Sequence, residues 1–119
     1  MTDLLTRARA QLDSGEPHAV RRACWLTRAA LEERVQVLLA AKGISAAGAS
    51  ERSRLTCLEG AYPENRELSG QAEYAWSRLS ETCHQHAYHL APTRAEASHL
   101  IEVVEWLRIG PEPAASGDT

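Results

Sequence analysis

The longest stretch of this sequence without a helix-breaking residue, 18–42, repeats its apolar side chains every three or four positions. The α-helix turns about 100° per residue, so this spacing gathers the side chains into one broad apolar stripe. Pro17 precedes the stretch and Gly43 follows it, and these residue types commonly begin and end helices. One long helix is therefore predicted here, with an apolar stripe formed by Val20, Ala23, Cys24, Leu26, Ala30, Leu31, Val35, Val37 and Leu38.

Four further segments show the same periodicity, and none shows the two-residue alternation of a half-buried strand. Ser50 and Thr93 each precede one of these segments, where a hydroxyl oxygen can accept a hydrogen bond from an amide of the first turn. Thr93 and Glu96 also have the spacing of a capping box, in which the carboxylate binds the amide of the threonine in return. The predicted helices cover residues 3–13, 18–42, 51–59, 67–89 and 94–109.

The connections between the four larger segments are short, apart from the region around 51–59, and short connections favour antiparallel neighbours. We therefore expect an all-α fold, an antiparallel four-helix bundle of up-and-down topology with one short extra helix. Residues 1–109 form one helical domain in this prediction, and residues 110–119 form a disordered tail. The expected core consists of Leu26, Leu31, Leu38, Leu58, Trp76, Leu79, Cys83, Leu100, Val104 and Leu107.

The charge of the chain is unevenly distributed, although its formal net value is only −3. Residues 1–54 carry nine basic and six acidic side chains, whereas residues 55–119 carry four and ten. The net value does not favour nucleic-acid binding by bulk electrostatics. The two halves either pack against each other, within one chain or between two copies, or are simply solvated helix faces.

The cysteines indicate a reducing compartment. The sequence contains three cysteines, Cys24, Cys57 and Cys83, and no two of them form a CxxC pair. The odd number of cysteines argues against a disulfide framework, and the sequence also shows no secretory leader. No apolar run approaches the ~20 residues that a membrane helix needs. We expect a cytoplasmic protein without a membrane partner.

Metal binding is the first chemistry that the histidine-rich segment suggests. Cys83 and His86, like His86 and His89, are three positions apart and can share an ion. A closed zinc site needs four ligands, however, and the thiols of Cys24 and Cys57 lie alone on separate predicted helices. No metal and no cofactor are therefore expected.

Metal-free cleavage of a phosphodiester needs only a group that transfers a proton near neutral pH and a cation that stabilises the phosphorane. His84 and Arg78 supply this pair. On an intact helix their backbones lie ~9 Å apart and their side chains point about 120° apart. A single phosphate contacts both side chains only if the helix is irregular here or a second chain contributes one of them. The alternative is that Arg78 and His84 are solvated and share no ligand.

The Arg78-x5-His84 spacing resembles the Arg-x(4–6)-His motif of the HEPN superfamily, and His86-Ala-Tyr88 resembles the His-x-Tyr that often follows it. The resemblance covers roughly residues 17–109. It implies that Arg78 stabilises the anion and that His84 or His86 transfers the proton, with Tyr88 completing the site. The Arg spacing selects His84 and the Tyr spacing selects His86, so both remain candidates.

Two classes of function follow from this resemblance. One is a metal-independent endoribonuclease of toxin or defence type, which acts on RNA and pairs with a protein such as an antitoxin. The other is a non-catalytic helical module for homodimerisation or interaction. Trp25 and Trp106 lie beside charged positions, off the main stripes, and exposed tryptophans commonly anchor interfaces. They favour a homodimer, unless they only cover the edge of the bundle.

Overall fold

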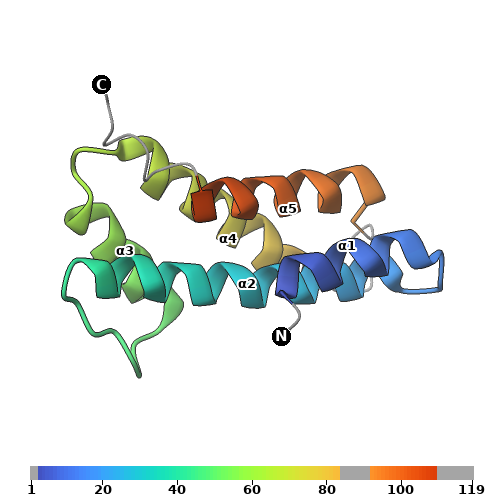
Figure 1. Ribbon diagram of the computed structural model, residues 1–119, viewed down its shortest axis with the longest axis horizontal. Helices are drawn as coiled ribbons and strands as arrows, with labels where there is room; N and C mark the ends of the chain where they lie inside the picture. Colours follow the sequence, from blue (N-terminus) through green and yellow to red (C-terminus); the bar gives the residue numbers. More distant parts are fainter. Residues whose placement is uncertain (1–2, 84–91, 110–119) are drawn as a thin grey trace.

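The computed structural model describes residues 3–83 and 92–109, and within these ranges it contains five α-helices and no strand (Figure 1). The helices are α1 (Leu4–Ser14), α2 (Ala19–Ala41), α3 (Glu51–Ala61), α4 (Arg66–Cys83) and α5 (Arg94–Ile109). The all-α prediction is thus confirmed for the described residues. The largest difference at a described helix end is in α3, which was expected to end at residue 59. The predicted end of the fourth helix at residue 89 and the predicted tail lie outside the described ranges.

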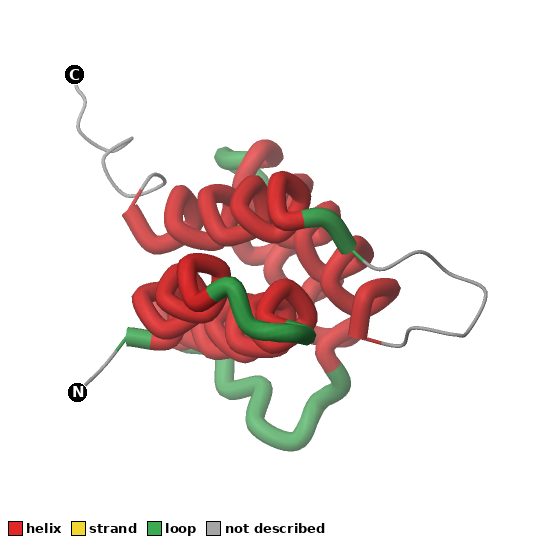
Figure 2. The backbone as a smooth tube through the Cα atoms, turned by 90° about the vertical axis from the view of Figure 1, so that its right-hand side faces the viewer, coloured by secondary structure: helices red, strands yellow, loops and turns green. Residues whose placement is uncertain are grey.

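Helix α2 lies at the centre of the packing and contacts each of the other four helices. Around it, α1 packs against α5, α5 against α4, and α4 against α3. The end-on view shows helices packed side by side, with the loops at the periphery (Figure 2). Because this arc ends at α1 on one side and at α3 on the other, no described helix covers the remaining side of α2.

Local sequence signals end and begin the helices where they were expected. Gly43 has a φ of 77°, and its amide donates to the carbonyl of Ala40 at 2.9 Å, which closes the last turn of α2. The Ser50 hydroxyl accepts from the amide of Ser53 at 3.1 Å and caps α3, as predicted. These ends therefore depend on short-range hydrogen bonds.

Only one half of the predicted capping box forms at the start of α5. The Thr93 hydroxyl accepts from the amide of Glu96 at 3.0 Å. The Glu96 carboxylate accepts instead from the guanidinium of Arg78 on α4. A hydrogen bond between two charged groups is stronger than one to a backbone amide, which explains the exchange. The prediction for this carboxylate was wrong, and the observed contact ties α5 to α4.

The core is an aliphatic cluster contributed by all five helices. Most of its predicted members are buried, namely Leu31, Leu38, Leu58, Leu79, Leu100, Val104 and Leu107. Leu26 and Trp76 are half-buried and pack against the cluster. The prediction for Cys83 is not tested, because its side chain is not among those that the structure describes. Val37 was expected in the stripe but is 47% exposed. The reason is that α1, with 11 residues, folds back along the first part of α2 only.

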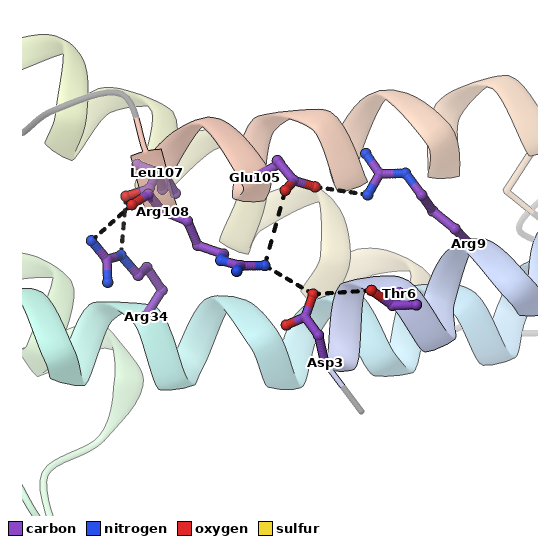
Figure 3. Close-up of polar contacts among 7 residues, drawn as sticks. All are labelled: Asp3, Thr6, Arg9, Arg34, Glu105, Leu107 and Arg108. Atoms are coloured by element: carbon purple, nitrogen blue, oxygen red, sulfur yellow. Dashed lines mark hydrogen bonds and ion pairs between the residues drawn. The ribbon is translucent and has the colours of Figure 1, made fainter. Parts of the chain in front are cut away.

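Polar contacts fix α5 to α1 and α2 (Figure 3). The Arg34 guanidinium of α2 donates to two carbonyls in the last turn of α5, at 3.0 and 3.2 Å, and so satisfies acceptors that have no partner within that helix. Arg108 binds the Asp3 carboxylate at 2.8 Å, and Arg9 binds Glu105 at 2.7 Å. Each exposed pair contributes less than ~1 kcal/mol, so the network orients the helices more than it stabilises them.

Candidate functional site

Arg78, the predicted anion-binding residue, lies near the end of α4 with its side chain 40% exposed. Its Nε donates to the Glu96 carboxylate at 2.9 Å, and a second nitrogen donates to the Glu81 carboxylate at 2.6 Å. The hydrogen bonding that Arg78 donates to the Glu96 carboxylate raises the pKa of the Arg78 guanidinium above its ordinary value. The charge of Arg78 is therefore already balanced by two carboxylates of its own chain.

The remaining predicted site residues, His84, His86 and Tyr88, lie outside the described ranges. The proposed pairing of Arg78 with an imidazole stays a prediction, as does the choice between the two histidines.

A second arginine lies beside Arg78 in the structure. Arg28, Trp76, Ser77, Arg78, Ser80 and Glu81 line an open groove between α2 and α4, the α2–α4 groove. Arg28 binds Glu32 at 3.2 Å, one turn further along its own helix. Both guanidinium groups thus have carboxylate partners, and a phosphate that binds here would compete with these carboxylates. Sequence reasoning missed Arg28, since no local signal links it to a residue fifty positions away on α4.

The uncovered side of α2 presents apolar side chains to solvent. Trp25 is 54% exposed and Val37 is 47% exposed, the two largest values among the described large apolar residues. A shallow groove follows the same side of the helix, lined by Ala29, Glu32, Glu33, Gln36, Val37 and Ala40. We call this surface, from Trp25 to Ala40, the α2 face. The sequence-based expectation of an exposed Trp25 is confirmed.

The expectation that Trp106 would be exposed in the same way is wrong. Trp106 is half-buried and packs against the core, because α4 lies alongside α5 at this position. Its ring forms part of an open groove of about 460 Å³ between the two helices, the α4–α5 groove. The lining residues repeat at helical spacing on both helices, as Glu67, Gly70, Gln71 and Tyr74 on α4 and His99, Glu102, Val103 and Trp106 on α5.

Two rings form the wall at one end of this groove. Tyr74 and His99 meet edge to face, with ring centroids 6.0 Å apart. Sequence reasoning missed the groove because its two walls lie about thirty residues apart in the chain. The only signal for it was the acidic excess of residues 55–119.

Neither a metal centre nor a membrane helix is found in the part of the chain that the structure describes. No three side chains of His, Cys, Asp or Glu gather there closely enough to share an ion. None of the helices there is both long enough and apolar enough to cross a bilayer.

Comparisons with models of protein families, with curated proteins and with solved structures found no match to this chain. Among the described residues, three surfaces are candidates for binding a partner or a substrate: the α2–α4 groove, the α2 face and the α4–α5 groove.

Proposed function

We propose that this protein is a helical interaction module that forms a homodimer through the α2 face. The observation that carries the proposal is the indole of Trp25, which is 54% exposed on a helix that is otherwise covered by four neighbours. Burial of a tryptophan removes a large apolar area from water, and interface centres are enriched in this residue. A second copy of the chain supplies such a cover by symmetry.

The charges on α2 support self-association. Arg22 lies on the exposed side one turn before Trp25, where its one ion pair, with Glu16, is long at 3.7 Å and exposed to solvent. Glu33 lies two turns beyond Trp25 and has no ion-pair partner among the described residues. A twofold axis near Arg28 makes two α2 helices antiparallel and sets Arg22 of each copy against Glu33 of the other. The same register places Trp25 opposite position 30 of the other copy, next to the exposed Ala29, whose small side chain leaves room for the indole.

Replacement of Trp25 by alanine is expected to weaken the dimer by roughly thirtyfold, the effect of losing a hot-spot residue worth ~2 kcal/mol. Sedimentation equilibrium of the full chain measures the change. Tyr74→Ala is the matched control, because Tyr74 is a 41% exposed aromatic residue on a different helix, and it should leave the dimer intact. Equal effects of the two variants, or a clean monomer of the unaltered protein at high micromolar concentration, would refute the proposal.

The register has its own test by charge reversal. Arg22→Glu and Glu33→Arg each place like charges together and should each weaken the dimer, whereas the double variant restores the pair and the association. If the double variant remains as weak as the single ones, the α2 helices do not pair in this register.

We further propose that α1, α2, α4 and α5 form an antiparallel four-helix bundle of HEPN-like topology, with α3 as the short extra helix. The tight turn at Gly15, with a φ of 70°, supports this, because it returns α2 along α1. A cytoplasmic location belongs to the same proposal. It is supported by the exposed thiol of Cys57, which suits a reducing compartment.

The second candidate is the metal-independent ribonuclease of toxin or defence type, with RNA and an antitoxin-like protein as partners. The observation that favours it is the presence of Arg28 and Arg78 in one groove, with Arg78 six positions before His84 in the sequence. The carboxylates of Glu81 and Glu96 weigh against it, because they occupy the guanidinium that would stabilise a phosphorane. We therefore rank it below the interaction module.

Purified protein is expected to leave single-stranded RNA intact in the presence of a chelator, since the charge of Arg78 is already balanced within the chain. A fluorescently labelled RNA, resolved on a denaturing gel, provides the measurement. Cleavage that disappears in both Arg78→Ala and His84→Ala, with unchanged helical circular dichroism, would establish the ribonuclease instead. The Arg78→Ala/His84→Ala double variant is the control, because cleavage that persists in it identifies a contaminating nuclease.

A further inference from the structure

Most carboxylates of this protein already form an ion pair with an arginine or lysine side chain. Of the fourteen Asp and Glu side chains in the described residues, ten form ion pairs within the chain. The four without such a partner are Glu33, Glu59, Glu67 and Glu102, all of them exposed. Two of these four, Glu67 and Glu102, line the α4–α5 groove, one from each wall.

The other lining residues of the groove suit a cation as well. None of them is Arg or Lys, so nothing in the lining neutralises the two carboxylates. Tyr74 is 41% exposed and Trp106 is half-buried, and the faces of such rings attract ammonium and guanidinium groups. The α4 and α5 helices run in opposite directions, and the contact between Tyr74 and His99 fixes their register (Figure 1). Glu67 therefore lies toward the Trp106 end of the groove, with Glu102 nearer the Tyr74 end.

We propose that the α4–α5 groove binds arginine side chains of a basic segment in a partner protein. An arginine offers a planar guanidinium that stacks on aromatic rings and binds carboxylates, with an aliphatic stem that can lie along Val103. The groove is open along its length and holds about 460 Å³, which suits an extended peptide side chain better than a compact ion. Residues 110–119 are excluded as the occupant, because they carry two acidic side chains and no basic one.

Gly70 forms part of the groove and makes it accessible. A Cβ built at Gly70 meets no atom within 4 Å, so the space above this residue is open to a ligand. A Cβ can therefore be added at this position without a clash, and a longer side chain attached there takes up space that the groove otherwise leaves to a ligand.

The proposal is tested with a capped tetra-arginine peptide, titrated into the ¹⁵N-labelled full chain and followed by NMR. We expect shifts confined to residues 67–74 and 99–106, including the indole signal of Trp106. Glu67→Gln with Glu102→Gln should weaken binding by about five- to tenfold, as two exposed charge pairs are lost. Glu59→Gln with Glu64→Gln removes the same charge at exposed positions outside the groove and outside the α2 face, and should change binding by less than about twofold.

A second variant separates loss of the site from loss of the fold. Gly70→Leu should abolish the peptide shifts while the helical signal is kept, because leucine favours a helix more than glycine does. Equal weakening by the two double variants would show that only bulk charge attracts the peptide, and would overturn the proposal. Groove shifts with tetramethylammonium but not with the peptide would assign a small organic cation instead. Groove shifts that grow with protein concentration alone would assign a second copy of the chain, again against the proposal.

Discussion

Replacement of Leu79 by alanine is expected to lower the free energy of unfolding by ~2–5 kcal/mol. Leu79 is completely buried on α4, within the cluster that all five helices share. Truncation removes its apolar contacts and leaves a cavity that neighbouring helices fill only in part. Since small domains are stable by only about 5–15 kcal/mol, this variant should lose a large fraction of its stability.

Urea denaturation followed by circular dichroism measures the loss, and Val37→Ala provides the matched control. Val37 is also an aliphatic residue in a helix, but at 47% exposure its truncation should cost less than about 0.5 kcal/mol. A similar loss in both variants, or a loss below about 0.5 kcal/mol for Leu79→Ala, would contradict the packing described here.

The helices were predictable because their signals are local. Gly43 ends α2 and Ser50 begins α3 through hydrogen bonds that span only a few residues. The periodic spacing of leucines in α4 and α5 likewise identifies the buried side of each helix without knowledge of its neighbours. Such features depend on backbone geometry and on the helical repeat, both of which the sequence reveals directly.

The errors arose where a neighbouring element decides the outcome. Val37 has helical spacing with buried residues, but α1 is too short to cover it. Trp106 lies off the main stripe of α5, yet α4 packs beside it. Glu96 has the position of a capping carboxylate, but Arg78 from another helix provides a stronger partner. Helix lengths and pairings of this kind are not encoded in a local pattern.

The candidate site was predictable only in part for the same reason. The contact between Arg78 and Glu81 has the i,i+3 spacing of an ordinary helical ion pair. Its partner Glu96 is eighteen positions away and joins the site through the packing of α5 on α4. The α4–α5 groove shares this property, because neither helix shows by itself that Glu67 and Glu102 line one groove.

Replacement of Arg54 by leucine is expected to destabilise the protein by roughly 2–4 kcal/mol at neutral pH. Arg54 and Glu51 form an ion pair at 3.3 Å in which the side chains are only 15% and 8% exposed. Burial raises the pKa of the Glu51 carboxyl above its ordinary value of 4.5, although Arg54 opposes the shift. Loss of the arginine leaves the carboxylate charged, nearly buried and without its partner, which is costlier than the absence of the pair.

The dependence on pH identifies Glu51 as the cause. Because its folded pKa is raised, ionisation of Glu51 opposes folding. Its penalty is absent below the unfolded pKa of about 4.5 and develops as the pH rises through the folded pKa. The loss of unfolding free energy caused by Arg54→Leu should therefore become smaller as the pH falls toward about 4. At about pH 7, the double variant Glu51→Gln/Arg54→Leu should recover most of the stability that the single variant loses. Urea denaturation at both pH values tests this. Arg54 also donates to the Ala46 carbonyl at 3.1 Å, so a deficit that is equal at both pH values and in the double variant would assign the effect to this loop contact instead.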